Sequence, residues 1–401
     1  MGKALSKANP SHVRKNDNGS DALQKRFYEI SNGNPNIDKV AFQKFTTTVL
    51  SPQMQSIIYD ALQNKENVIT EKTFIKFAKM MLGDKDQQAE ALIQFNRPVE
   101  EILDAIVSSF FMYQNLDLQS GTLLTDYFMQ NMPPALNVRT LSNFIKREIL
   151  LQIMIAQTNQ MLHLVPGSNF LFLPETCKHS ILTSAALCLL YANLPENLRA
   201  HWKLIFSSVR DGESFTQLLK NVSDAGPCLI VIETASNRVF GGFADQGFTS
   251  GPLHTGDTQC FLFQDRQKLN IYHSTGYNKN FCYINTRQAS MPNGIGMGGY
   301  DDNWSFFVDE DLRTGNSTPG MSTFEKCWLA EETTYMPKTI EIWQIGERWS
   351  QAEDMILNEI VRERTLTNKR EARAVLELSG KELRGDIFKD QKKFNINNIK
   401  Q

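Results

Sequence analysis

The sequence predicts an α+β protein in which an all-helical N-terminal domain precedes an antiparallel β-sandwich, and a further helix follows the sandwich. Two observations predict this order. From Asp21 to about Leu164, apolar residues recur at three- and four-residue spacing, as on the buried face of an amphipathic helix. After Pro166, the apolar runs shorten to strand length and are divided by Gly, Asn and Asp turns. The expected segments are residues 1–20, 21–165, 166–346 and 347–401.

The composition is that of an ordinary globular protein, with 401 residues, 41% of them hydrophobic and 21% charged. A formal net charge of -2 gives no reason to expect nucleic acid as a partner of the whole chain. Six scattered cysteines without a C-x-x-C pair are typical of a reducing compartment. The longest apolar stretch, Ile181 to Leu194, is too short to span a bilayer, so we expect no transmembrane helix.

Residues 1–20 read as a flexible basic leader. The start Met1-Gly2-Lys3-Ala4-Leu5-Ser6 fits the myristoylation pattern, with glycine second and serine sixth. One acyl chain binds membranes only marginally, so stable attachment needs a second signal. We expect acylation of Gly2, with four basic side chains as the membrane-contacting second signal: Lys3, Lys7, Arg14 and Lys15. The alternative is a plain disordered N-terminus.

Residues 21–165 predict six to eight helices separated by short polar breaks rich in Asn, Gly and Pro. Two of these breaks suggest a pair of EF-hand-like loops, with Ile37 and Ile69 as their central hydrophobic residues. The twelfth loop positions are then Ala41 and Thr73, where calcium needs a bidentate glutamate. We therefore expect a degenerate EF-hand-like domain that does not bind calcium.

Residues 166–346 begin with an expected helix from Cys177 to Leu190 and continue as strands. Ser214 is expected to cap a short helix over Phe215 to Leu219. In the last strand, Ile340 and Ile342 alternate with Glu341 and Trp343. The expected strands are Leu204–Phe206, Leu229–Ile232, Val239–Phe243, Phe261–Phe263, Leu269–Tyr272, Phe281–Ile284, Phe306–Val308 and Ile340–Ile345.

The stretch from Ser350 to Leu378 is predicted to form a charged helix, for which Gly380 is a good stop. One face gathers apolar side chains, of which Met355, Ile356 and Ile360 are candidates for binding a partner groove. The alternative is a solvated helix that packs on its own domain.

No motif predicts catalysis, a cofactor or a metal. Gly294-x-Gly296-x-x-Gly299 matches the dinucleotide fingerprint formally, but a turn and a strand follow it, whereas the pyrophosphate site requires a helix. The histidines do not occur at metal-ligand spacing. Glu233 and Glu341 interrupt apolar strands, and we expect them to point to solvent on the outer sheet face, with a cleft as the alternative.

The second half of the chain carries an ordered series of aromatic and glycine motifs. The series is His201-Trp202-Lys203-Leu204-Ile205-Phe206-Ser207-Ser208, Asp211-Gly212-Glu213-Ser214-Phe215, Gly226-Pro227-Cys228, Phe240-Gly241-Gly242-Phe243, Gly256-Asp257, Cys260-Phe261-Leu262-Phe263, Gly294-Ile295-Gly296-Met297-Gly298-Gly299 and Ile340-Glu341-Ile342-Trp343. In order and spacing it resembles the TLDc domain, a family tied to oxidative-stress resistance and to the vacuolar proton pump. The resemblance implies a two-sheet sandwich flanked by helices, with six scaffold glycines: Gly241, Gly242, Gly294, Gly296, Gly298 and Gly299.

The order of leader, helical domain, sandwich and C-terminal helix resembles the lysosomal branch of this family that is linked to mTOR signalling. This resemblance implies a non-catalytic cytoplasmic protein, peripheral on the cytosolic face of the lysosomal membrane. The implied partners are the vacuolar-type proton ATPase and components of the mTOR pathway. Two alternatives remain: a redox-protective protein that acts through Cys260 or Cys282, and a calcium-switched adaptor, which the missing loop glutamates disfavour.

Overall fold

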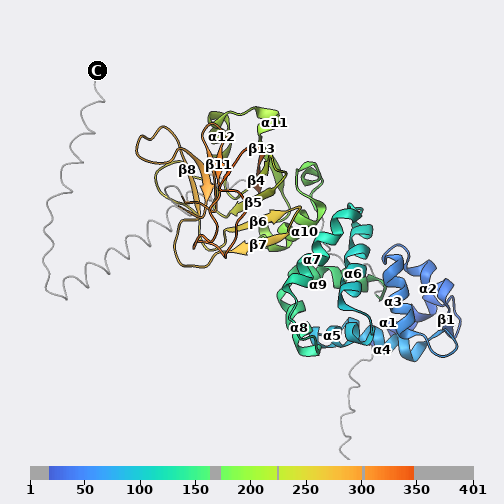
Figure 1. The fold of residues 1–401 in the computed structure, drawn as a ribbon. Helices are drawn as coiled ribbons and strands as arrows, with labels where there is room; N and C mark the ends of the chain where they lie inside the picture. Colours follow the sequence, from blue (N-terminus) through green and yellow to red (C-terminus); the bar gives the residue numbers. More distant parts are fainter. Residues whose placement is uncertain (1–17, 163–172, 224, 300–302, 347–401) are drawn as a thin grey trace, which may run out of the picture. The chain divides into compact units, whose positions relative to one another are not determined.

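The computed structural model describes residues 18–162, 173–223, 225–299 and 303–346 (Figure 1). Within these residues an N-terminal helical region is followed by two antiparallel sheets, so the predicted α+β class is confirmed. Gly2, the four basic residues of the leader and the predicted C-terminal helix lie outside the described residues. Residues 18–20, which were predicted to belong to the leader, form the start of the first helix.

The helical region consists of nine α-helices between residues 18 and 162 of the described chain, more than the six to eight that the sequence predicts. One reason is the boundary at Glu148, where a single extended residue (φ -87°, ψ 92°) separates two helices. The helices are α1 Asn18–Ile30, α2 Lys39–Thr46, α3 Pro52–Leu62, α4 Glu71–Met81, α5 Lys85–Gln94, α6 Val99–Gln114, α7 Gly121–Asn131, α8 Val138–Arg147 and α9 Ile149–Thr158.

Polar side chains mark where these helices begin. The oxygen atoms of Asp38, Ser51 and Thr70 accept hydrogen bonds from backbone N–H groups in the first turns of α2, α3 and α4. These bonds satisfy donors that have no partner within the helix. Asp84 and Asn137 open α5 and α8 with reciprocal capping boxes.

The first four helices form two helix-loop-helix units joined through their loops. Strands β1 (Asn36–Ile37) and β2 (Ile69–Thr70) pair antiparallel, with Ile37 opposite Ile69. Both isoleucines are fully buried. This pairing confirms the predicted EF-hand-like arrangement.

The second region is a sandwich of two antiparallel sheets. The larger has the order β3-β13-β4-β5-β6-β7, and the smaller has the order β12-β11-β10-β9-β8. Every predicted strand overlaps an observed one. The strands are β3 Trp202–Ser207, β4 Cys228–Thr234, β5 Val239–Ala244, β6 Phe261–Asp265, β7 Asn270–His273, β8 Cys282–Asn285, β9 Gly294–Met297, β10 Phe306–Asp309, β11 Gly315–Asn316, β12 Thr334–Tyr335 and β13 Pro337–Ile345.

Both faces of the larger sheet are buried. Along β13, Ile340 and Ile342 enter the apolar core between the sheets, as the predicted alternation requires. Trp343 faces the other way and belongs to the same apolar cluster as the helix α10, Ser184–Asn193. The larger sheet is therefore covered by a second sheet on one face and by apolar residues of this cluster on the other.

Two helices flanking the sheets can be compared with the sequence predictions. The predicted cap at Ser214 is confirmed, since its oxygen accepts from the Gln217 N–H at the start of α12 (Phe215–Val222). The expected helix from Cys177 to Leu190 is wrong at its start. Thr183 caps α10, and Glu175–His179 forms only a short 3-10 turn before it.

Candidate functional site

The scaffold glycines lie where strands approach one another closely. A Cβ atom on Gly241 of β5 would lie 1.9 Å from the carbonyl oxygen of Ile230 in the neighbouring strand, and one on Gly294 of β9 would lie 2.2 Å from that of Val308. Gly242 faces the opposite sheet, where a Cβ atom would lie 2.5 Å from the sulfur of Met297. Packing therefore opposes a side chain at these positions, most rigidly at Gly241 and Gly294, where the close neighbour is a backbone atom, and Gly294 also has a positive φ of 154°.

The glycines after β9 form a tight turn. Gly298 adopts a positive φ of 75°, which favours glycine, and a Cβ atom there would meet Ser305 Oγ at 2.4 Å. Gly299 is constrained by space, because a Cβ atom would lie 2.0 Å from the Asn303 carbonyl oxygen. The next described element is the strand β10, so no helix N-terminus follows the turn within the described residues to hold a phosphate.

Two strand carboxylates are buried, and the expectation that they point to solvent is wrong. Glu233 accepts hydrogen bonds from Arg266 at 2.7 Å and from Lys338 at 3.2 Å. Burial raises the pKa of Glu233, whereas the hydrogen bonds and charges of these two cations lower it. Together the cations outweigh burial, so the pKa lies below its ordinary value. Glu341 accepts from Ser180 Oγ and from the indole N–H of Trp343, each at 2.9 Å.

Glu341 fastens the segment before α10 to the sheet, and Glu233 contributes indirectly through Arg266, which also donates to the Ile181 carbonyl oxygen at 3.2 Å. Asp265 acts in the same way, accepting from both the backbone N–H and the hydroxyl of Thr183, at 2.8 and 2.6 Å. This clamp was not predicted from the sequence. The available signal was a carboxylate within an apolar strand. Such a group is buried only if it has hydrogen-bonding or charged partners, so its presence indicates a contact with another segment.

All six cysteines are buried and unbridged. Cys260 and Cys282 are neighbours, with their sulfur atoms 3.7 Å apart, and the Cys260 thiol donates to Asp245 Oδ1 at 2.9 Å. Burial raises the pKa of Cys282 well above its usual value and raises those of Cys228 and Cys327 to about 12. A reactive thiol needs exposure and a lowered pKa, so this environment does not favour redox chemistry.

His254 joins the loop before β6 to the glycine turn. Its Nε2 donates to the Gly299 carbonyl oxygen at 2.6 Å, and its ring stacks on Trp304 with 5.7 Å between centroids. Burial lowers the pKa of His254, while the bond to Gly299 opposes that shift. His254 therefore has a structural role, and the neutral ring is favoured.

The twelfth positions of the paired loops lie at helix starts. The Ala41 N–H donates to the Asp38 carboxylate at 2.7 Å, and the Thr73 N–H donates to Thr70 Oγ1 at 3.4 Å. Among the residues that the structure describes, no group of three His, Cys, Asp or Glu side chains could hold a metal ion. The absence of calcium binding remains a prediction.

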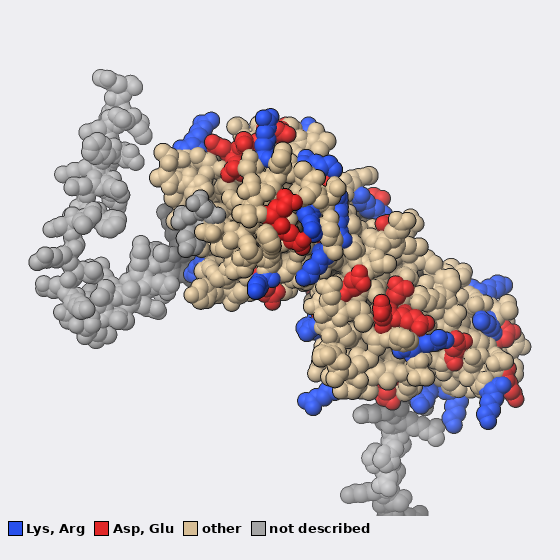
Figure 2. All heavy atoms as spheres, in the orientation of Figure 1, with Lys and Arg blue, Asp and Glu red and all other residues tan. Residues whose placement is uncertain are grey.

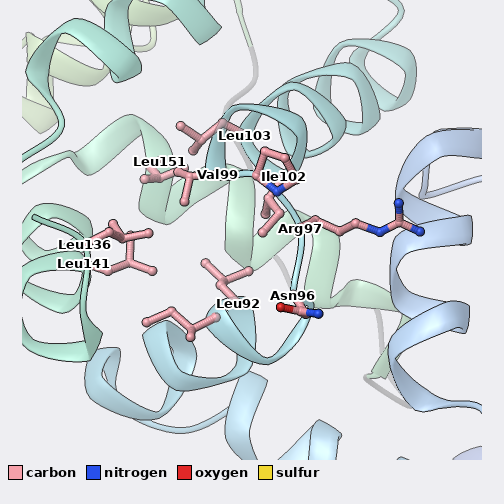
Figure 3. Close-up of a pocket in the computed structure, with 11 residues that line it drawn as sticks. Leu92, Asn96, Arg97, Val99, Ile102, Leu103, Leu136, Leu141 and Leu151 are labelled. Atoms are coloured by element: carbon pink, nitrogen blue, oxygen red, sulfur yellow. The ribbon is translucent and has the colours of Figure 1, made fainter. Parts of the chain in front are cut away.

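An apolar candidate binding site lies elsewhere, in the helical region. An apolar pocket of about 350 Å³ opens between α5, α6, α8 and α9 (Figure 3). Arg97 at its edge is directed away, and donates to Asp60 at 2.9 Å. The lining residues are Leu92, Ile93, Asn96, Arg97, Pro98, Val99, Ile102, Leu103, Leu136, Leu141 and Leu151.

This pocket was not predicted from the sequence, because its walls come from two pairs of helices, α5 with α6 and α8 with α9, that are separated in the chain. Two partly exposed residues at its rim, Ile93 and Leu136, gave a weak signal, since isolated exposed apolar residues are common. In the described parts of the chain, no helix is long and apolar enough to cross a membrane.

The comparisons with known proteins agree with this architecture. Residues 176–346, which contain the sandwich and α10, match the family model of the TLDc domain. The predicted resemblance to that family is confirmed, and this part of the chain is a TLDc domain.

Curated relatives extend the similarity. The chain is 36% identical to MTOR-associated protein MEAK7 of Xenopus laevis over 213 residues, which are 53% of this chain and 45% of that protein. It is 34% identical to the protein of the same name from Homo sapiens over 203 residues, 50% of this chain and 43% of the relative. Human nuclear receptor coactivator 7 is 27% identical over 174 residues, 43% of this chain and 18% of its own. The matched part of the chain thus spans less than half the length of these relatives.

Proposed function

We propose that this chain is a non-catalytic interaction protein of the mTOR pathway. It docks on the vacuolar-type proton ATPase at the cytosolic face of the lysosomal membrane. The observation that carries the proposal is the TLDc domain combined with 32–36% identity to relatives named MTOR-associated protein MEAK7.

The geometry of the TLDc domain supports a binding role over a catalytic one. Its buried carboxylates Glu233, Glu341 and Asp265 are held by hydrogen bonds that fasten chain segments together. Its thiols are buried, and its glycines are closely packed. In the described part of the domain, the carboxylates Glu233 and Glu341, which the sequence singled out, thus have structural partners.

Membrane recruitment is assigned to the leader. An acyl group on Gly2 inserts into the bilayer, and the basic side chains Lys3, Lys7, Arg14 and Lys15 interact with anionic lipid. Gly2→Ala removes only the attachment point, so membrane partition falls while the fold is retained. Neutralising the four basic residues weakens the partition in a salt-sensitive way. Unchanged partition of Gly2→Ala in cell fractions would show that protein contacts hold the chain at the membrane.

Partner binding is assigned to the TLDc domain together with the C-terminal segment, where Met355, Ile356 and Ile360 are the candidate contacts. The test is affinity capture from lysosomal membranes with the full chain and with a chain that lacks residues 347–401. We expect the full chain to retain pump subunits and mTOR pathway components, and the shortened chain to retain less. Equal capture by both chains would remove the C-terminal segment from the interaction.

A further inference from the structure

We propose that the apolar pocket between α5, α6, α8 and α9 binds the acyl group of the chain's own N-terminus. The acyl group is sheltered there when the protein is away from a membrane and leaves the pocket when the protein binds one. This inference rests on the acylation of Gly2 in the proposed function. It adds to that function a defined binding site for the acyl group. Movement of the acyl group between this site and the bilayer would regulate membrane binding.

The lining of the pocket defines the chemistry of its ligand. Nine of the eleven lining residues are aliphatic or proline, and none is aromatic. Arg97 is directed out and paired with Asp60. Sites for polar ligands combine an apolar wall with a few convergent polar groups, and only Asn96 and Arg97 at the edge are polar here. A saturated hydrocarbon chain is the ligand class that fits such a lining.

The pocket is small for a helix as the occupant. Its volume is about 350 Å³. An α-helix with its side chains is about 10–12 Å in diameter, so the apolar face around Met355 and Ile356 would need an open groove. A flexible acyl chain is thinner than a helix and adapts to the space available.

The extended leader is longer than the helical region is wide. Gly2 lies sixteen positions before Asn18, where α1 begins. An extended peptide of that length spans about 50 Å. A domain of this size has a radius of gyration of about 15 Å and is about 40 Å across. Tethering then gives the acyl group a local concentration on the order of millimolar.

Charges beside the pocket complement those of the leader. The first turns of α6 carry Glu100, Glu101 and Asp104 among the lining residues Val99 and Ile102. Figure 2 shows a group of acidic side chains on the visible face of the helical region. The leader, in contrast, has Lys3 directly after Gly2 and Lys7 four positions beyond Lys3. Anionic lipid competes for these lysines, so a charged membrane favours release of the acyl group.

The exchange is feasible because membrane binding by one acyl chain is weak. The association constant of a single myristoyl group with a bilayer is on the order of 10⁴ M⁻¹. With a local concentration on the order of millimolar, a pocket that binds free fatty acid at about 10 μM would be about 99% occupied. Modest pocket affinity therefore suffices to compete with the bilayer.

The first experiment tests the pocket without acylation. Unacylated full-length protein is titrated with myristate, which displaces a fluorescent fatty acid. We expect saturable binding of one molecule, weakened at least tenfold by Leu136→Trp, which places an indole at the pocket rim where Leu136 is 40% exposed. Leu118→Trp, at a position 56% exposed and outside the lining, is the matched control and leaves binding unchanged. Absence of saturable binding, or equal binding by both variants, overturns the proposal.

The second experiment uses the acylated full chain with vesicles that contain phosphatidylserine. Leu136→Trp expels the acyl group and raises vesicle partition several-fold, and Leu118→Trp does not. Added myristate does not bind the acylated wild type, because its pocket is filled. If myristate binds the acylated and unacylated chains equally, or if both variants partition alike, the leader does not occupy the pocket. Capture of the proton pump by the same preparations tests the proposed function separately.

Discussion

Gly299 tests whether the glycine turn after β9 is a packing element or a nucleotide cradle. In Gly299→Ala, the added Cβ atom would lie 2.0 Å from the carbonyl oxygen of Asn303 and 2.6 Å from the Cα atom of Trp304. Both neighbours are backbone atoms, so rotation of a side chain cannot relieve the contact. The backbone must shift, at a cost of about 1–3 kcal/mol in the free energy of unfolding.

The matched control is Gly276→Ala. Gly276 has a positive φ of 73°, but nothing lies within 4 Å of an added Cβ atom. Its substitution therefore costs only backbone strain, about 1 kcal/mol. For a domain of this size, each kcal/mol lowers the melting temperature by about 2–4 °C. If Gly299→Ala costs about 3 kcal/mol, the upper end of the range, we expect its melting temperature to fall by about 6–12 °C. We expect the melting temperature of Gly276→Ala to fall by about 2–4 °C.

Scanning calorimetry of the full-length protein measures both shifts. A Gly299→Ala protein that melts at or above the temperature of the Gly276→Ala protein would refute the packing argument. Adding NAD or ATP to the wild type supplies a second criterion, because a ligand that binds only the native state raises its melting temperature by mass action. We expect no shift at millimolar nucleotide, and a saturable rise would indicate a nucleotide site.

Further predictions concern calcium, acid stability and thiol reactivity. Calorimetric titration of the full chain with near-millimolar calcium should give no saturable heat from the paired loops, and a micromolar site would contradict their assignment. Burial lowers the folded-state pKa of His254, so its contribution to stability is complete above about pH 6.5 and is lost as the pH falls through the folded pKa. Urea midpoints measured from pH 7.5 downward should therefore decline less in His254→Gln than in the wild type, and parallel declines would exclude the assignment. Cys260 and Cys282 should resist a thiol reagent until the protein is unfolded. Rapid modification of either one in the native protein would support the redox alternative.

The sequence predicted the strands well wherever apolar residues were continuous. β4 and β13 were predicted because β-branched and aromatic residues fill them. The strand β9 was missed, because Gly294 and Gly296 give it no such run. Its extended form comes from pairing with β8 and β10 on either side, which is a tertiary effect that local propensity does not contain.

Of the candidate sites, the sequence likewise predicted the one that depends on local residues and missed those that depend on tertiary packing. The loop pair was predictable, since Ile37 and Ile69 hold fixed positions in two short polar breaks. The clamp on the segment before α10 was not, because Glu341 and Ser180 are 161 positions apart in the chain. The pocket likewise depends on the packing of four helices, so no local pattern marked Leu103 and Leu151 as neighbours.

The central claim is tested most directly by measuring the binding of purified full-length protein to purified, detergent-solubilised vacuolar-type proton ATPase. Biolayer interferometry with immobilised pump gives the affinity, and the Gly299→Ala protein serves as the control for domain integrity. We expect saturable binding by the wild type, and weaker binding by Gly299→Ala at temperatures where its TLDc domain loosens. Absence of binding by the folded, acylated wild-type chain would contradict the account.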